Sequence, residues 1–343
     1  GIQNNLLNAG DNVSVTATFS ETPISAVIVE SGTATLTLVV GSANRTATLH
    51  SGSSTIVSGS DNASLVFQYT IQATGTSGEN DDDGISIGAN ALNSNSITIR
   101  DAAGNIATDL THSAVSANTS YKVDTTALTV NSFTISDTLL VVGDNATVDL
   151  VFSEPASFSS DDDITVANGT LAAMTSSDNI TWTGTFTPNA NTEEDNNTLS
   201  LDNASYTDLA GNAGPSETTA NYVVDTKAPS VSSLQLTDGV TTISTFTDRC
   251  LPVTSNIMVT FDDVMDRDLI TTNTSDTFCR AGSLLVSSNN FCDGEGCCVQ
   301  MSFGDPEASN SNRTFTLDPN GNLSYDTTYK VRVTTGVKDV LGN

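Results

Sequence analysis

The chain has 343 residues, of which 37% are hydrophobic and only 6% aromatic. Its 40 Asp and Glu residues against 11 Lys and Arg residues give a formal net charge of -29 at pH 7. Such a charge argues against nucleic acid or anionic lipid as a partner and favours cations, although it also keeps an extracellular protein soluble. No stretch approaches the roughly 20 apolar residues of a membrane helix, so we expect no direct membrane insertion.

Alternating hydrophobic and polar residues predict the first strands of three similar units. The alternation runs through residues 13–19 and 146–152, and a shorter version follows at 257–261. The first two stretches are preceded by Gly-Asp-Asn and followed by Ser-Glu. This period of two is typical of half-buried strands.

A short acidic signature, Asp-x-x-Gly-Asn, returns at residues 101–105, 208–212 and 339–343. The phrase Tyr-x-Val-Asp-Thr follows the first two copies, at 121–125 and 222–226. A signature that recurs roughly every hundred residues indicates an array of similar modules. Many short strands separated by Gly, Asn and Asp turns favour antiparallel sandwiches over βαβ units.

These motifs resemble the bacterial Ig-like repeats of giant surface adhesins and biofilm-associated proteins. In those repeats a strand ending in Phe-Ser-Glu, an Asp-x-x-Gly-Asn loop and a Val-Asp-Thr-x-Ala-Pro linker recur. The third unit is similar to the S-layer-type Ig-like domain. Leu128 departs from the pattern, because a Pro is expected in the first linker.

The resemblance implies an all-β fold of three tandem Ig-like antiparallel β-sandwich domains in an extended array. We expect Ig-like domain 1 at residues 1–124, domain 2 at 125–226 and domain 3 at 227–343, the last with a Cys-containing insertion at about 271–312. Pro229 restricts the residue before it and donates no hydrogen bond, which suits a short, stiff joint.

Acidic loops where modules meet predict calcium sites. Calcium takes about six to eight oxygen ligands, which Asp and Asn side chains can supply, and repeats of the resembling kind often stiffen their joints with calcium. The alternative is that these residues only form Asx-turns. The candidate ligands are Asp101, Asn105 and Asp124 at the first joint, Asp208, Asn212 and Asp225 at the second, and Glu21, Glu154, Asp11 and Asp144 near module ends.

Two runs of three aspartates, at residues 81–83 and 161–163, also invite a metal reading. Runs of like charge are more often solvated turns, which we favour for both.

The five cysteines all lie in the third unit. Outside the cell they would close up to two intramolecular disulfides and leave one cysteine over, with a pairing that the sequence leaves open. A zinc site from Cys292, Cys297 and Cys298 is the alternative, but the spacing is not that of two CxxC knuckles. The cysteines are Cys250, Cys279, Cys292, Cys297 and Cys298.

Asn-x-Ser/Thr sequons are only slightly more frequent than chance in a chain so rich in Asn, Ser and Thr. We expect glycans on several of them if the source organism adds N-linked glycans. The sequons begin at Asn12, Asn44, Asn62, Asn118, Asn145, Asn168, Asn179, Asn196, Asn203, Asn273, Asn312 and Asn322.

Catalytic motifs are absent from the sequence. The two imidazoles, His50 and His112, lie in no zinc-protease or nucleophile-base motif, and no phosphate loop or dinucleotide fingerprint occurs. The lone Trp182 sits in an alternating strand, where we expect a core side chain. The sequence therefore predicts a protein that is not an enzyme.

Three functions remain open. The first is a non-catalytic extracellular structural or adhesive segment at the cell surface, a rod of Ig-like repeats stiffened by calcium at its joints, whose partners are neighbouring repeats. The second is a repeating subunit of an extracellular assembly, such as an S-layer, fibre or flagellar hair, which binds copies of itself. The third is a module that binds a receptor or glycan through the domain 3 insertion, because long loops on a rigid sandwich often carry binding.

Overall fold

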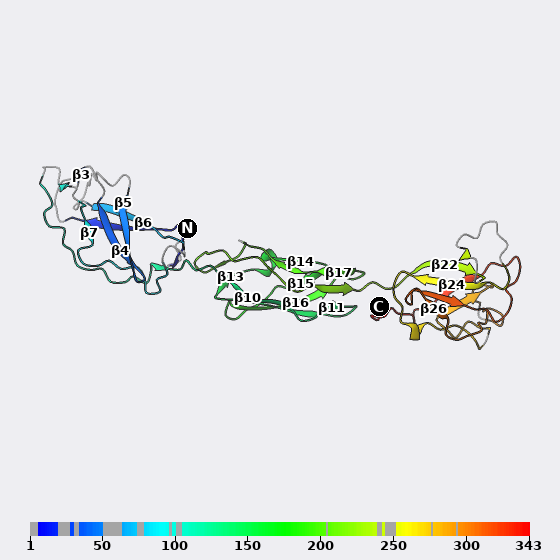
Figure 1. Ribbon diagram of the computed structural model, residues 1–343. Coiled ribbons are helices and arrows are strands. Elements are labelled where there is room, and N and C mark those ends of the chain that lie inside the picture. Colours follow the sequence, from blue (N-terminus) through cyan, green and yellow to red (C-terminus); the bar gives the residue numbers. More distant parts are fainter. Residues whose placement is uncertain are drawn as a thin grey trace.

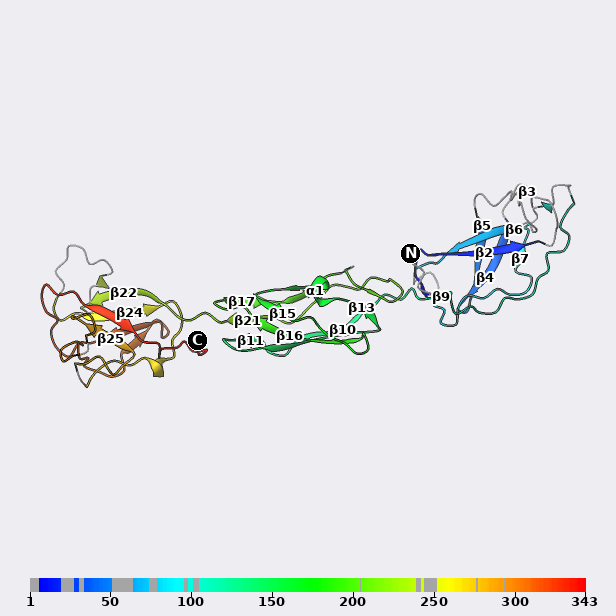
Figure 2. The same cartoon turned by 180° about the vertical axis from the view of Figure 1, so that it is seen from behind.

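A computed structural model describes residues 6–19, 28–30, 34–50, 64–73, 79–95, 98–100, 105–203, 205–238, 242–243, 252–275, 277–292 and 294–343. Three modules whose regular elements are almost all strands follow one another end to end (Figure 1), and the view from behind shows the same extended arrangement (Figure 2). The predicted all-β fold in an extended array is thus confirmed. Among the described residues, no helix is long and apolar enough to cross a membrane.

Module 1 contains one antiparallel five-stranded sheet and two short strand pairs. The sheet order is β2 (Asn12–Thr18), β6 (Ser64–Thr70), β5 (Ala43–Leu49), β4 (Thr35–Val40) and β7 (Leu92–Asn93). The pairs are β1 (Leu6–Leu7) with β9 (Lys122–Val123), which run parallel, and β3 (Ile28–Glu30) with β8 (Thr98–Arg100).

Module 2 is a sandwich of one larger sheet against smaller ones. The larger sheet has the order β10 (Val130–Ile135), β12 (Ala146–Phe152), β16 (Thr181–Pro188) and β15 (Gly169–Leu171). The smaller sheets are β11 (Leu139–Leu140), β21 (Tyr222–Asp225) and β17 (Glu193–Asn197); β14 (Ile164–Val166), β18 (Leu199–Leu201) and β20 (Glu217–Thr218); and β13 (Ala156–Ser157) with β19 (Thr207–Asp208). A short helix, α1 (Ser160–Asp163), precedes β14.

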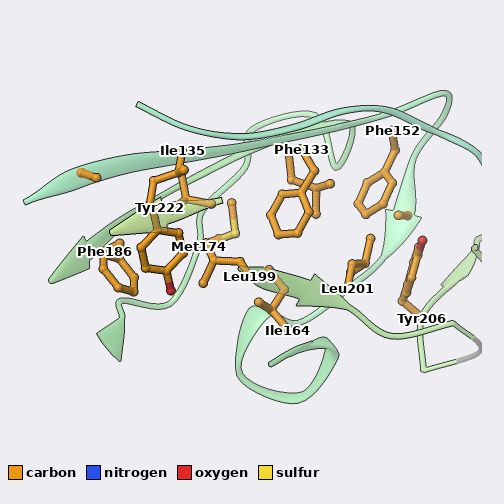
Figure 3. Close-up of a cluster of buried hydrophobic side chains, with 14 of the residues drawn as sticks. Phe133, Ile135, Phe152, Ile164, Met174, Phe186, Leu199, Leu201, Tyr206 and Tyr222 are labelled. Atoms are coloured by element: carbon orange, nitrogen blue, oxygen red, sulfur yellow. The ribbon is translucent and has the colours of Figure 1, made fainter. Parts of the chain in front are cut away.

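The core of module 2 follows from the alternation along β12, where Ala146, Val148, Leu150 and Phe152 are buried as predicted. Figure 3 shows this core, in which Phe133, Phe152, Phe186, Tyr206 and Tyr222 are among the buried side chains. Phe152 packs on Tyr206 with ring centroids 5.3 Å apart. Trp182 is partly buried at the margin of this core and contacts Phe158.

Module 3 repeats the plan with a five-stranded sheet and a separate pair. The sheet order is β23 (Thr242–Ile243), β22 (Val231–Thr237), β24 (Asn256–Phe261), β27 (Thr314–Leu317) and β26 (Glu307–Ser309), and β25 (Leu284–Ser287) pairs with β28 (Lys330–Val333). The 3-10 helix η1 (Arg267–Leu269) follows β24.

The insertion of module 3 is closed by two disulfides, Cys279–Cys298 and Cys292–Cys297. Two intramolecular bridges were predicted, and they occupy all three sulfurs of the alternative zinc site, which is therefore wrong. Cys250 lies outside the described residues.

The first aspartate run lies in a bend and the second lies in α1, and neither is wholly solvated. Asp81 is buried and accepts hydrogen bonds from the main-chain N–H groups of Gly41 and Gly84, each at 2.7 Å. Asp163 is also buried and accepts from the N–H of Ser159 at 2.7 Å. The other four aspartates are exposed.

One sequon is inaccessible in the fold, because Asn273 is only 1% exposed. Asn62 lies outside the described residues. The remaining sequon asparagines are exposed or half-buried, and their glycosylation stays a prediction.

Candidate metal centre

Two triads of carboxylates lie at the two joints between modules. The first triad is Asp124, Glu154 and Asp208, and the second is Asp225, Asp263 and Asp339. Within each triad, one carboxylate oxygen from every residue lies within 4.8 Å of the others. Each triad therefore collects at least three hard anionic oxygens at one point.

The first triad is assembled from two modules. Asp124 follows β9, the last strand of module 1. Glu154 comes two residues after β12, and Asp208 ends β19 and opens the second signature loop; both belong to module 2. The last strand of one module thus delivers its aspartate to the strand end and signature loop of the next.

The second triad repeats this construction. Asp225 ends β21 of module 2, Asp263 comes two residues after β24, and Asp339 opens the third signature loop. The equivalence of Glu154 with Asp263 and of Asp208 with Asp339 was visible in the repeated sequence. Our candidate ligands nevertheless omitted Asp263 and Asp339, and aligning the third unit in full would have found them.

The predicted ligands are grouped differently from the expectation. Asp208 and Asn212 lie with Asp124 rather than with Asp225. The Asp208–Asn212 loop lies at the end of module 2 that meets module 1. Asp225 instead ends β21, which runs to the opposite end of module 2, where module 3 begins.

The other predicted ligands fall outside both triads. Asp11 and Asp144 accept hydrogen bonds from the N–H groups of Asn8 and Val141, each at 3.1 Å, in equivalent turns. Asn105 is exposed and belongs to neither triad of the described residues. Glu21 and Asp101 lie outside those residues.

The second signature loop wraps around its own aspartate, Asp208. Asp208 Oδ1 accepts the N–H groups of Ala210, Gly211 and Asn212 at 2.8, 2.8 and 2.9 Å. Gly211 has φ of +96°, a left-handed conformation that favours glycine. The Asx-turn alternative is therefore correct for the loop itself, and the loop holds Asp208 in place in the triad.

The final Asn of the second and third signatures ties the loop to the linker. Asn212 Nδ2 donates to Asp208 Oδ2 at 2.8 Å and to the main-chain oxygen of Asp124 at 3.0 Å. Asn343 Nδ2 makes the same two contacts, to Asp339 Oδ2 at 3.0 Å and to the oxygen of Asp225 at 3.1 Å. At both joints, therefore, an uncharged Asn side chain donates a direct hydrogen bond to the main chain of the preceding linker aspartate.

One carboxyl group of each triad has a raised pKa. Burial raises the pKa of Glu154, and the neighbouring charges of Asp124 and Asp208 raise it further. Burial likewise raises the pKa of Asp225, with Asp339 and Asp263 adding to the effect. Like charges at this separation in a partly desolvated site repel, so a divalent cation would be stabilised there.

The donor set suits a hard cation. Carboxylate oxygens without imidazole or thiolate favour calcium, magnesium or manganese over zinc or copper. Calcium accepts irregular coordination by carboxylates and waters more readily than magnesium, which demands near-octahedral geometry. The residues present therefore fit calcium.

The boundaries of two protein-family matches coincide with the joints between modules. A family described as "Bacterial Ig-like domain" matches residues 124–224, and a second family of the same description matches residues 225–343. No curated protein matches the sequence. Among matching solved structures is FdeC, described as a novel, broadly conserved Escherichia coli adhesin, at 13% identity over 98% of this chain and 91% of that one, with a TM-score of 0.30. By the two family matches, residues 124–343 of this chain belong to families of bacterial Ig-like domains.

Proposed function

We propose that this chain is a non-catalytic segment of an extracellular cell-surface protein, a rod of Ig-like modules whose joints bind calcium. Tandem bacterial Ig-like domains support a structural or adhesive role. The proposal includes module boundaries near residues 124 and 225, where each linker aspartate enters a triad. The observation that carries the calcium part is the pair of carboxylate triads, each built from both sides of a joint.

A cation in a triad would stiffen the joint for a simple reason. Asp124 belongs to the end of one module, whereas Glu154 and Asp208 belong to the next. Without a cation their mutual repulsion favours any bend that separates them. A bound calcium ion converts that repulsion into a bridge and fixes the direction of the linker.

Isothermal titration calorimetry of calcium into the cation-stripped full chain tests the proposal. We expect saturable binding that Asp208→Asn weakens at the first triad and Asp339→Asn at the second. Asparagine keeps the oxygen that accepts the loop N–H groups, so the loops should persist. Asp161→Asn removes an exposed carboxylate of α1 and is the matched control. Undetectable binding, or equal loss in the control, would refute the calcium function.

The other two functions stay predictions. Growth of particle mass with concentration would favour an assembly subunit. Binding of a glycan or receptor that depends on the disulfide-closed insertion would favour a ligand-binding module.

A further inference from the structure

A lysine joins the two modules at the second joint. Lys227, in the linker, places its Nζ 2.8 Å from Glu193 Oε2 and 3.5 Å from Asp262 Oδ2. Glu193 begins β17 of module 2, and Asp262 follows β24 of module 3. One ammonium group therefore lies between carboxylates that belong to different modules.

Asp262 is held in place for this contact. Its two carboxylate oxygens accept from the N–H and the hydroxyl of Ser230, at 2.6 and 2.9 Å. Its own N–H donates to the oxygen of Ser230 at 2.9 Å. The carboxylate is thus oriented by its own module and needs no rearrangement to receive Lys227.

The equivalent positions of the first joint are all uncharged. Thr126 follows Asp124-Thr125 as Lys227 follows Asp225-Thr226. Asn80 corresponds to Glu193, because the residue after each pairs with the valine of the last strand. Ser153 corresponds to Asp262, because its N–H donates to the oxygen of Thr129 at 2.9 Å as that of Asp262 donates to Ser230.

These uncharged residues make contacts, but none that joins the modules. Asn80 Nδ2 donates to Thr126 Oγ1 at 2.5 Å, which ties the linker to module 1. Ser153 Oγ accepts from the N–H of Thr129 at 3.0 Å, within module 2. The first joint therefore lacks a counterpart of the Glu193–Lys227–Asp262 group at these positions.

A basic side chain also lies beside the second triad. Arg313 places a guanidinium nitrogen 3.7 Å from Asp263 Oδ1 and also donates to the main-chain oxygen of Asp262. The equivalent residue beside the first triad is Ile180. Its main-chain oxygen accepts the N–H of Phe152, just as the main-chain oxygen of Arg313 accepts the N–H of Phe261. Residues 125–226 contain fifteen Asp and Glu and no Lys, Arg or His, so module 2 has no cationic side chain to offer.

We propose that Lys227, supported by Arg313, is a tethered counter-charge that keeps the second joint extended without a divalent cation, so that calcium controls bending at the first joint alone. The statement about calcium rests on the proposed function, whereas the role of Lys227 does not. A tethered cation acts at any calcium concentration. Because the pair is partly exposed, it should weaken as salt rises.

Single-molecule FRET on the full chain tests this inference. Dyes are attached through noncanonical amino acids at exposed strand positions, Thr46 and Thr183 for the first joint and Thr183 and Ser309 for the second. In low-salt buffer we expect EDTA to broaden the distance distribution across the first joint and to leave the second unchanged. Lys227→Thr introduces the residue found at the equivalent position of the first joint, Thr126. This variant should broaden the distance distribution across the second joint in EDTA.

Two further variants make the test specific. Lys330→Thr removes the same charge from β28, away from the joint triad, and should leave the second joint narrow. The triple variant Asn80→Glu, Thr126→Lys and Ser153→Asp transplants the charged group and should make the first joint resist EDTA.

The outcomes separate the two proposals. If EDTA broadens both joints of the unaltered chain equally, the role of Lys227 is wrong and the calcium function stands. If EDTA changes neither joint, calcium control of the first joint is wrong, and the Lys227→Thr variant still decides the role of the lysine. A second joint that stays narrow in Lys227→Thr overturns that role.

Discussion

The core of module 2 contains several aromatic contacts, whereas module 3 combines a mostly aliphatic core with two disulfides. In module 2, Phe152 contacts Phe158 and Tyr206, and Phe186 contacts Tyr222. In the described part of module 3 the one ring pair is Phe261 with Phe315, 6.1 Å apart, and two disulfides close the insertion. Both modules bury an apolar core, but that of module 2 is richer in aromatic contacts, and module 3 adds covalent bonds across its loops.

Phe152→Ala should have the largest effect on this comparison. Phe152 is fully buried in the module 2 core, and Phe→Ala in a core costs about 3 to 5 kcal/mol. Calorimetric unfolding should show the module 2 transition falling steeply while the module 3 transition stays. Phe303→Ala, which truncates a side chain that is 66% exposed, is the control and should change neither.

Removing the disulfide that closes the longer loop, Cys279–Cys298, should destabilise module 3 selectively. Cys279 and Cys298 are 19 residues apart, and closing such a loop is worth about 3 kcal/mol. The bridge between Cys292 and Cys297, five residues apart, should be worth about 2 kcal/mol. Urea unfolding of the Cys279→Ser/Cys298→Ser and Cys292→Ser/Cys297→Ser pairs measures both. A larger loss from the shorter loop would contradict the comparison.

Salt should stabilise module 2 more than module 3. Residues 125–226 carry fifteen acidic and no basic side chains, whereas residues 227–343 carry fourteen acidic and eight basic ones. Raising ionic strength from about 0.01 M to about 1 M shortens the Debye length from about 30 Å to about 3 Å, which screens self-repulsion. Thermal unfolding in NaCl without divalent ions should therefore raise the module 2 midpoint the more. Equal shifts would show that module charge is not the cause.

The smallest expected effect is the pH dependence of the cation-free joints. The folded-state pKa values of Glu154 and Asp225 are raised, first by burial and then by like charges. The folded state therefore holds these protons more tightly than the unfolded chain, so the free energy of unfolding falls as pH rises through the raised values. Glu154→Gln should flatten this dependence between acidic and neutral pH. Glu194 is an exposed residue of β17, and Glu194→Gln should leave this pH dependence unchanged.

The strands were readable from the sequence because their burial is local. Alternation along residues 146–152 gives the buried face of β12 directly, since side chains of a strand point to opposite faces. The repeated signatures likewise gave the modular array.

The grouping of the triads was not readable in the same way. It depends on which end of a module each loop and linker reaches, which only the three-dimensional path of the chain decides. No sequence motif marks Lys227, because its partners Glu193 and Asp262 lie 34 and 35 residues away on opposite sides of the joint.

Small-angle X-ray scattering of the purified full chain, first with saturating calcium and then with excess EDTA, tests the central claim most directly. The account predicts an elongated particle in calcium whose maximum dimension shortens or whose flexibility rises in EDTA, because the first joint loses its cation. Superimposable scattering curves in calcium and EDTA would contradict a calcium-stiffened rod.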